Sequence, residues 1–172
     1  MIWCAARTAA QDDGAPTEHD VKAAFLYHFT RFVEWPPDTP DDRRRFVVAV
    51  LGAEPFGKAV ERTLAGKTAG DAPLEVRQIS RIEEAEGAKV LFIGASESKH
   101  LTQILDALDG RGVLTIGDGS EFAERGGIIG FRTVENKVRL DINLDQATRC
   151  GLRISSELLK LARLVRARGG GG

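Results

Sequence analysis

The chain has 172 residues and a formal net charge of -1, with 42% apolar and 28% charged residues. This size and composition are typical of a globular protein with one domain that buries a substantial core. The near-neutral charge argues against wholesale nucleic-acid binding, which requires a basic surface. No apolar run reaches the ~18 residues that would span a membrane.

The amino-terminal segment is rich in small and apolar residues and is followed by a polar stretch. Thr8, Ala9 and Ala10 are small enough for cleavage by a secretory peptidase, with Gln11 as the mature start. We interpret residues 1–16 as a truncated signal-peptide remnant plus a flexible leader, with a disordered cytosolic terminus as the alternative. Cys4 is a poor lipid-attachment site because a tryptophan precedes it.

The first helix is predicted to begin at Thr17, which has an acidic partner three residues later, as in a capping box. Its aromatic residues recur at helical spacing on one face, and we interpret them as core: Phe25, Phe29, Phe32 and Trp35. Two prolines at positions 36 and 37 predict that the helix ends at Trp35.

Strands and helices then alternate. Short β-branched or apolar runs predict buried strands at residues 46–51, 74–79, 90–94 and 113–116. Between them we expect a helix with Phe56, Val60 and Leu64, a weak helical turn at 82–86, and a helix with Leu101, Ile104, Leu105 and Leu108. Ser96 is expected to cap that last helix, and Ser120 a short helix that ends at Gly126 and Gly127.

The alternation of strands with helices stops after residue 127. Two alternating apolar runs flank Glu135 and Asn136, which predicts a hairpin with the asparagine in the left-handed position. The last predicted helix has Ile154, Leu158, Leu161 and Val165 on one face. Its opposite face is basic, and we expect that face to be solvated, with contact to anionic lipids as the alternative.

These elements predict an α/β three-layer sandwich whose mainly parallel sheet has a C-terminal antiparallel hairpin. Residues 17–166 are expected to form a single domain, and residues 167–172 a disordered tail.

The sequence predicts neither an enzyme nor a metal or cofactor site. The segment Gly66-Lys67-Thr68 lacks the upstream glycine of a phosphate loop, and His19, His28 and His100 have no ligand spacing. No serine lies on the expected nucleophile elbow. Asp118 and Asp141 are expected in a turn and on an exposed strand face.

Loops that follow parallel strands are the places where open α/β sheets bind ligands. Here they are residues 52–54, 95–97 and 117–119. We therefore regard Ser96 and Asp118 as candidate ligand-loop residues, with ordinary turns as the alternative.

Five blocks, in order, together resemble the YfiR-like family. They are YHFTRFVEWP at 27–36, VLFIGASE at 90–97, FAERGGIIGF at 122–131, VRLDINL at 138–144 and GLRISSELLKLARLV at 151–165. The resemblance covers about residues 18–166.

The resemblance implies a periplasmic, non-enzymatic repressor that contacts the periplasmic sensor region of an inner-membrane diguanylate cyclase. Repression would lower cyclic di-GMP and hence biofilm formation, and in some systems an outer-membrane lipoprotein relieves it. A homodimer is also implied. Relatives use intrachain disulfides as redox sensors, but only Cys150 lies in this domain, so we expect a buried free thiol, with pairing between chains as the alternative.

The family supplies no catalytic residues, so the predicted site is a partner interface. It comprises Phe122, Arg125, Ile129, Phe131, Glu135 and Arg139, because a glycine pair beside apolar residues favours a loop that contacts a partner. The alternative is that Phe122, Ile129 and Phe131 fill the core. The rival function is a periplasmic small-ligand sensor or adaptor for another receptor, such as a sensor histidine kinase.

Overall fold

A computed structural model describes residues 14–37, 44–52 and 54–169. The predicted signal-peptide remnant, Cys4 and the last three glycines lie wholly or largely outside these residues, as does the middle of the turn after the two prolines. No helix in the described part of the chain is long and apolar enough to cross a membrane.

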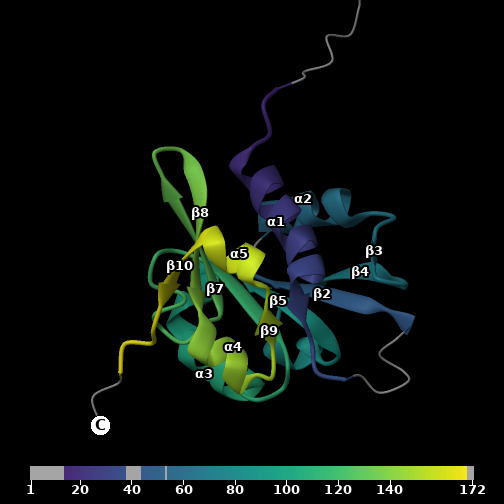
Figure 1. Ribbon diagram of the computed structural model, residues 1–172. Helices are drawn as coiled ribbons and strands as arrows, with labels where there is room; N and C mark the ends of the chain where they lie inside the picture. The colour runs from purple at the N-terminus through teal and green to yellow at the C-terminus, as the bar shows by residue number, and fades with distance from the viewer. Residues whose placement is uncertain (1–13, 38–43, 53, 170–172) are drawn as a thin grey trace, which may run out of the picture.

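An eight-stranded sheet runs through the molecule (Figure 1), in the order β10-β8-β7-β6-β5-β2-β4-β3. Its strands are β2 (Phe46–Leu51), β3 (Thr68–Ala69), β4 (Ala72–Ile79), β5 (Ala88–Ile93), β6 (Leu114–Asp118), β7 (Ile129–Val134), β8 (Lys137–Asn143) and β10 (Ala162–Val165). Only the β7–β8 and β3–β4 pairs are antiparallel. The predicted parallel sheet with a C-terminal hairpin is confirmed.

Helices cover both faces of this sheet. They are α1 (Glu18–Phe32), α2 (Glu54–Leu64), α3 (Leu101–Leu108), α4 (Leu144–Arg149), α5 (Ser156–Lys160) and the short 3₁₀ helices η2 (Ile82–Ala85) and η3 (Ala95–His100). Figure 1 shows α1 and α2 side by side over the sheet. In β2, Val48 and Val50 pack in the cluster with α1 and α2, whereas Val47 and Ala49 pack in the cluster with α3. The strand is therefore covered on both faces, which makes the fold three layers.

The first helix begins as predicted and ends earlier than predicted. The Thr17 side chain accepts a hydrogen bond from the Asp20 amide, and the Asp20 carboxylate accepts one from the Thr17 amide, which completes a capping box. The helix ends at Phe32 rather than Trp35, because Val33 turns extended and begins β1 (Val33–Glu34). That short strand pairs antiparallel with β9 (Arg153–Ile154).

The hairpin forms at the predicted turn. Glu135 and Asn136 both have positive φ angles, of 50° and 60°, so the glutamate shares the left-handed region with the asparagine. Such a pair of residues matches the twist of the two flanking strands and fixes the β7–β8 register.

Two predicted helices are absent or broken. The single helix expected after residue 150 is instead β9, the short helix α5 and β10. Its helical spacing is overridden because β9 pairs with β1 and β10 pairs with β8; Leu161, expected in the core, is 69% exposed. The helix expected after Ser120 is a series of turns.

The remaining differences concern two polar residues. Ser96 lies within η3 rather than capping α3, and its hydroxyl donates to the Gly52 carbonyl at 2.7 Å. Asp141 was expected on an exposed strand face and is fully buried. The alternation along β8 places Asp141 on the face of the sheet away from Leu140 and Ile142, as predicted. Arginines and the turn that follows β6 cover that face, so Asp141 is buried there.

Candidate functional site

The predicted partner interface divides into a buried half and an exposed half. Phe122, Ile129 and Phe131 have exposed fractions of 5%, 0% and 2%, so their side chains fill the core under the hairpin. The Phe131 ring stacks with Phe29 and packs at a tilt against Phe92. Phe122 lies so close to Gly127 that a Cβ there would come 2.1 Å from the ring. The structure thus favours the core alternative for these three residues.

Arg125, Glu135 and Arg139 are the exposed members of that set. Arg125 extends from the turn after β6, whereas the other two lie in and beside the hairpin turn. A contact between these residues and a partner stays a prediction, and it now depends on three charged side chains rather than on an apolar surface.

A cleft opens beyond the carboxyl ends of β5 and β6. Its volume is about 320 Å³, and its lining includes Asp118, Ser98 and Arg125. Arg125 donates from Nη2 to the Ser98 carbonyl at 2.9 Å, which joins the turn after β6 to η3. The carboxyl edge of a parallel sheet is the usual place for a ligand, so the structure does provide a hollow where the sequence predicted ligand loops.

The two candidate ligand-loop residues differ in their relation to this cleft. Asp118 lines it, whereas Ser96 does not. The Ser96 hydroxyl instead closes the gap between the ends of β2 and β5 by its bond to Gly52. A Cβ on Gly52 would lie 2.7 Å from that hydroxyl oxygen, so the two loops are in direct contact there.

Asp118 also belongs to a charged cluster with α1. The Lys22 ammonium lies 2.7 Å from Asp118 Oδ1 and pairs with Glu18, and its side chain is only 7% exposed. The Phe131 ring lies beneath it, with the ammonium 5.9 Å from the ring centroid. This cluster connects the lining of the cleft to the first helix.

The lysine of this cluster is held in its charged form. Burial lowers the pKa of Lys22, but hydrogen bonds and charge attraction to Asp118 and Glu18 outweigh it, so the pKa is raised overall. The hydrogen bond from Lys22 lowers the pKa of Glu18. A lysine that is kept protonated orients groups and neutralises charge, and it cannot serve as a general base at neutral pH.

A second charged cluster lies two strands away from Asp118, on β8 and β10. Asp141 is buried and accepts bonds from Arg163, at 2.7 and 3.0 Å, and from Arg132 Nε at 3.3 Å. Arg168 Nε lies 2.7 Å from Glu124, which also faces Arg163 at 3.9 Å. Sequence reasoning missed this cluster, because Arg163 was expected on a helix; treating its segment as a strand would have placed it beside Asp141.

A groove lies between the start of α1 and the hairpin. Its volume is about 390 Å³, and Arg139 and Asn136 line one wall while Glu18 and Phe25 line the other. Thr133 donates its hydroxyl hydrogen to Glu18 at 3.1 Å, which holds the hairpin against the helix. The groove therefore brings one member of the predicted interface next to the Lys22 cluster.

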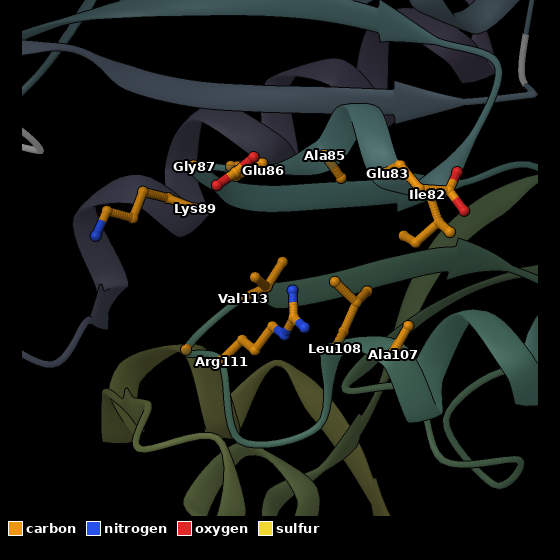
Figure 2. A pocket seen from close by; sticks show the side chains of 12 residues that line it. Ile82, Glu83, Ala85, Glu86, Gly87, Lys89, Ala107, Leu108, Arg111 and Val113 are labelled. Carbon is orange, nitrogen blue, oxygen red and sulfur yellow. The ribbon is translucent and has the colours of Figure 1, made fainter.

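A wider hollow of about 560 Å³ lies at the opposite, amino-terminal ends of β5 and β6. Figure 2 shows the Arg111 side chain extending into it beside Leu108 and Val113, with Glu86 across the gap. No serine, cysteine or histidine lines this hollow. It offers an apolar wall and charges of both signs, but no nucleophile.

Cys150 is buried, as predicted, and it is a free thiol. Burial is the main reason why its pKa is raised, and Gln146 Nε2 lies 3.8 Å from its sulfur. A thiol with a raised pKa reacts poorly, and its burial disfavours pairing between chains. Within residues 14–37, 44–52 and 54–169, no group of three or more His, Cys, Asp or Glu residues is placed to hold a metal ion.

Comparison with known proteins gives a family and a fold. Residues 19–163 match the protein family described as YfiR/HmsC-like. No curated protein sequence matches the chain. A similar solved structure is the ABC domain in complex with L-Trp from Streptococcus pneumonia, at 11% identity and a TM-score of 0.52. The match covers 70% of this chain and 55% of that chain, so it shows a shared fold and the present chain spans about half of that protein.

Proposed function

The chain belongs to the YfiR/HmsC-like family of periplasmic diguanylate cyclase regulators, and we propose that it represses one such cyclase by binding the cyclase's periplasmic sensor region. The family match across residues 19–163 is the observation that carries this proposal. Repression lowers cyclic di-GMP in the cell. We further propose that the protein acts in the periplasm.

Repression of this kind is allosteric. The protein changes cyclase activity only if it binds the inactive state of the cyclase more tightly than the active state. The exposed Arg125, Glu135 and Arg139 supply charge at the candidate contact, and the buried phenylalanines beneath them hold the hairpin and turn in position. We further propose that the protein acts as a homodimer, which suits a two-fold symmetric cyclase.

The test measures binding and activity together. The protein, starting at the predicted mature residue Gln11, is titrated by calorimetry into the purified periplasmic region of the cyclase encoded beside it. We expect saturable binding with Kd on the order of micromolar or tighter. Addition to the full-length cyclase in nanodiscs should lower its rate of cyclic di-GMP synthesis.

Binding without any change in cyclase rate would contradict repression and leave an adaptor role. An absence of binding at concentrations on the order of 100 μM would contradict the partner itself. An outer-membrane lipoprotein that relieves repression would compete with the cyclase region for the protein in the same titration.

A second function, a periplasmic ligand sensor or adaptor for another receptor such as a histidine kinase, is favoured by one observation. The cleft beyond β5 and β6 is lined by Asp118 and Arg125, a carboxylate and a guanidinium of opposite charge, at the edge where α/β sheets bind ligands. The sensor function is tested by measuring the melting temperature with each member of a library of small zwitterions, for the wild type and for Arg125→Ala. A ligand that stabilises the wild type and not the variant would support the sensor.

A further inference from the structure

Strand β10 ends the eight-stranded sheet. It pairs with β8 on one side, in parallel, through Ala162 to Val165. On its other side no strand of the described chain follows, so the outward row of its backbone N–H and C=O groups has no strand partner there. Such a row is a template on which another extended chain forms main-chain hydrogen bonds.

Large apolar side chains are exposed at this edge. Leu161 and Leu164 are 69% and 56% exposed, and the other exposed large apolar residue of the described chain, Val134, is only 37% exposed. Leu161 caps α5 just before the strand, and Leu164 lies within it. These two exposed leucines lie in and next to the unpaired edge strand, so an added strand could bury them.

The same segment is strongly basic. Residues 149–169 contain six basic residues and one acidic residue, although the whole chain has a net charge of -1. Lys160 and Arg166 lie at the two ends of β10 and are exposed, Arg166 with a side chain that is 90% exposed. An occupant of this edge is therefore expected to be acidic as well as apolar.

The edge is also held in place before any partner arrives. Arg163, the central cation of β10, is bound from the inside by the buried Asp141 carboxylate. Beyond the strand, the Arg168 amide donates to the Glu124 carbonyl at 2.9 Å, and its guanidinium contacts the Glu124 carboxylate. A strand of four residues that is fixed at its middle and its end loses little conformational entropy on binding.

We propose that β10 is the docking edge for an extended acidic and apolar segment of the regulatory partner, which adds to the sheet as a further strand. This inference rests on the proposed function and adds β10, with its own chemistry, to the candidate contact at Arg125, Glu135 and Arg139. A second copy is a poorer occupant, because two β10 strands side by side would bring Arg163 and Arg166 against the same cations. A lipid surface would not use the backbone edge.

The experiment compares substituted forms of the whole chain in the titration with the cyclase region. Leu164→Glu and Arg166→Glu each place negative charge on the edge, and both side chains are exposed, so the fold should survive. We expect each to weaken binding roughly tenfold or more, as truncation at an energetic centre of an interface does. The matched control Arg111→Glu, at an exposed arginine away from β10 and from the hairpin, should change Kd less than about twofold.

A second measurement does not depend on substitutions. Hydrogen exchange of the wild type should slow at the amides of residues 162–165 when the cyclase region is added. Wild-type binding with unchanged Kd in both edge variants and no protection of these amides would overturn the inference and leave the proposed function intact. An absence of wild-type binding would overturn both.

Two further outcomes would assign the edge to another occupant and overturn the inference. One is a wild-type dimer that Leu164→Glu converts to a monomer by light scattering while its binding to the cyclase region is unchanged. The other is binding to vesicles with anionic headgroups that is lost in Arg166→Glu, again with unchanged binding to the cyclase region.

Discussion

Asp118 on β6 and Asp141 on β8, with only β7 between those strands, show that the same side chain can have different roles. Asp118 is 35% exposed, faces a cleft and has one lysine as its partner. Asp141 is 1% exposed and is held by two arginines on neighbouring strands. A planar guanidinium binds a carboxylate with fixed geometry, whereas an ammonium is a point charge that adapts. The Asp141 cluster therefore fixes an edge strand, and the Asp118 cluster leaves a polar group facing solvent.

Asp141→Asn is expected to have the largest effect. It leaves Arg132 and Arg163 without their shared charge, and we expect a loss of about 2 to 3 kcal/mol in the free energy of unfolding. This is less than the roughly 3 to 5 kcal/mol for a broken pair that is fully buried, because Arg163 is half exposed and regains water. Urea denaturation measures the loss.

The matched control is Asp145→Asn. Its carboxylate is 69% exposed and lies 3.8 Å from Arg166, so the substitution should change stability by less than about 0.5 kcal/mol. Equal losses for the two variants would show that burial of Asp141 contributes nothing, and the contrast between the two aspartates would fail.

Lys22→Met should cost less than Asp141→Asn, about 1 to 2 kcal/mol, by the same urea measurement. The methionine keeps the packing on Phe131, while Asp118 and Glu18 are exposed enough to be hydrated once the ammonium is gone. Lys58→Met, at an exposed position on α2, is the control and should be near neutral. A loss larger than that of Asp141→Asn would reverse the order of the two clusters.

The Lys22 cluster should make the free energy of unfolding depend on pH. The Glu18 pKa is lowered in the folded state, so its contribution is present above its ordinary pKa of 4.5 and is lost as the pH falls through the lowered value. The Lys22 pKa is raised above 10.5, so its contribution is present below 10.5 and is lost as the pH rises through the raised value.

The stability curves of the wild type and Lys22→Met should therefore differ most between these limits and approach each other at both extremes, because one member of the ion pair is neutral there: Glu18 at acid pH and Lys22 at alkaline pH. Urea midpoints measured from acid to alkaline pH give the two curves. Parallel curves across the whole range would contradict the role of this ion cluster.

Arg168→Ala should affect stability less than Asp141→Asn and Lys22→Met, by less than about 1 kcal/mol, because its side chain is 72% exposed. The substitution removes the contact with Glu124 just beyond β10, so we expect its effect to be confined to that strand. Hydrogen exchange at residues 162–165 should quicken while exchange near Lys22 stays unchanged. A uniform increase over the whole chain would show that the cluster does not act on the edge strand alone.

Sequence reasoning located one of the two aspartates well and the other only in part. Asp118 follows a buried strand, and the rule that ligands bind beyond strand ends was enough to place it at a hollow. For Asp141, alternation along the hairpin indicated the correct face. It could not indicate what covers that face, because the covering residues come from the turn after β6 and from a segment assigned to a helix.

The carboxyl-terminal segment shows why that assignment failed. Leu158 and Leu161 have helical spacing, and a helix does begin at Ser156, with the Ser155 hydroxyl accepting from the Leu158 amide. The helix stops within five residues because the chain gains backbone hydrogen bonds by pairing with β8. Local periodicity does not include that long-range pairing, which also leaves Leu161 in water.

The predicted interface failed in a similar way for its apolar members. Phe122 and Phe131 were chosen because they flank a glycine pair, yet Gly127 of that pair leaves the space in which the Phe122 ring packs against the backbone. A glycine next to a phenylalanine indicates close packing as readily as it indicates a mobile loop. The tertiary structure decides which, since it alone shows whether another side chain occupies the space.

By itself the sequence determined the parallel sheet, the capped first helix, the hairpin turn and the family, since each depends on residues that are neighbours along the chain or on blocks in a fixed order. Only the tertiary structure decided that Asp141 is buried between two arginines, that Lys22 joins Asp118 to the first helix, and that β10 forms the open edge of the sheet. The physical reason is that burial and strand pairing join residues far apart in the chain, and the gain from those contacts overrides local propensity.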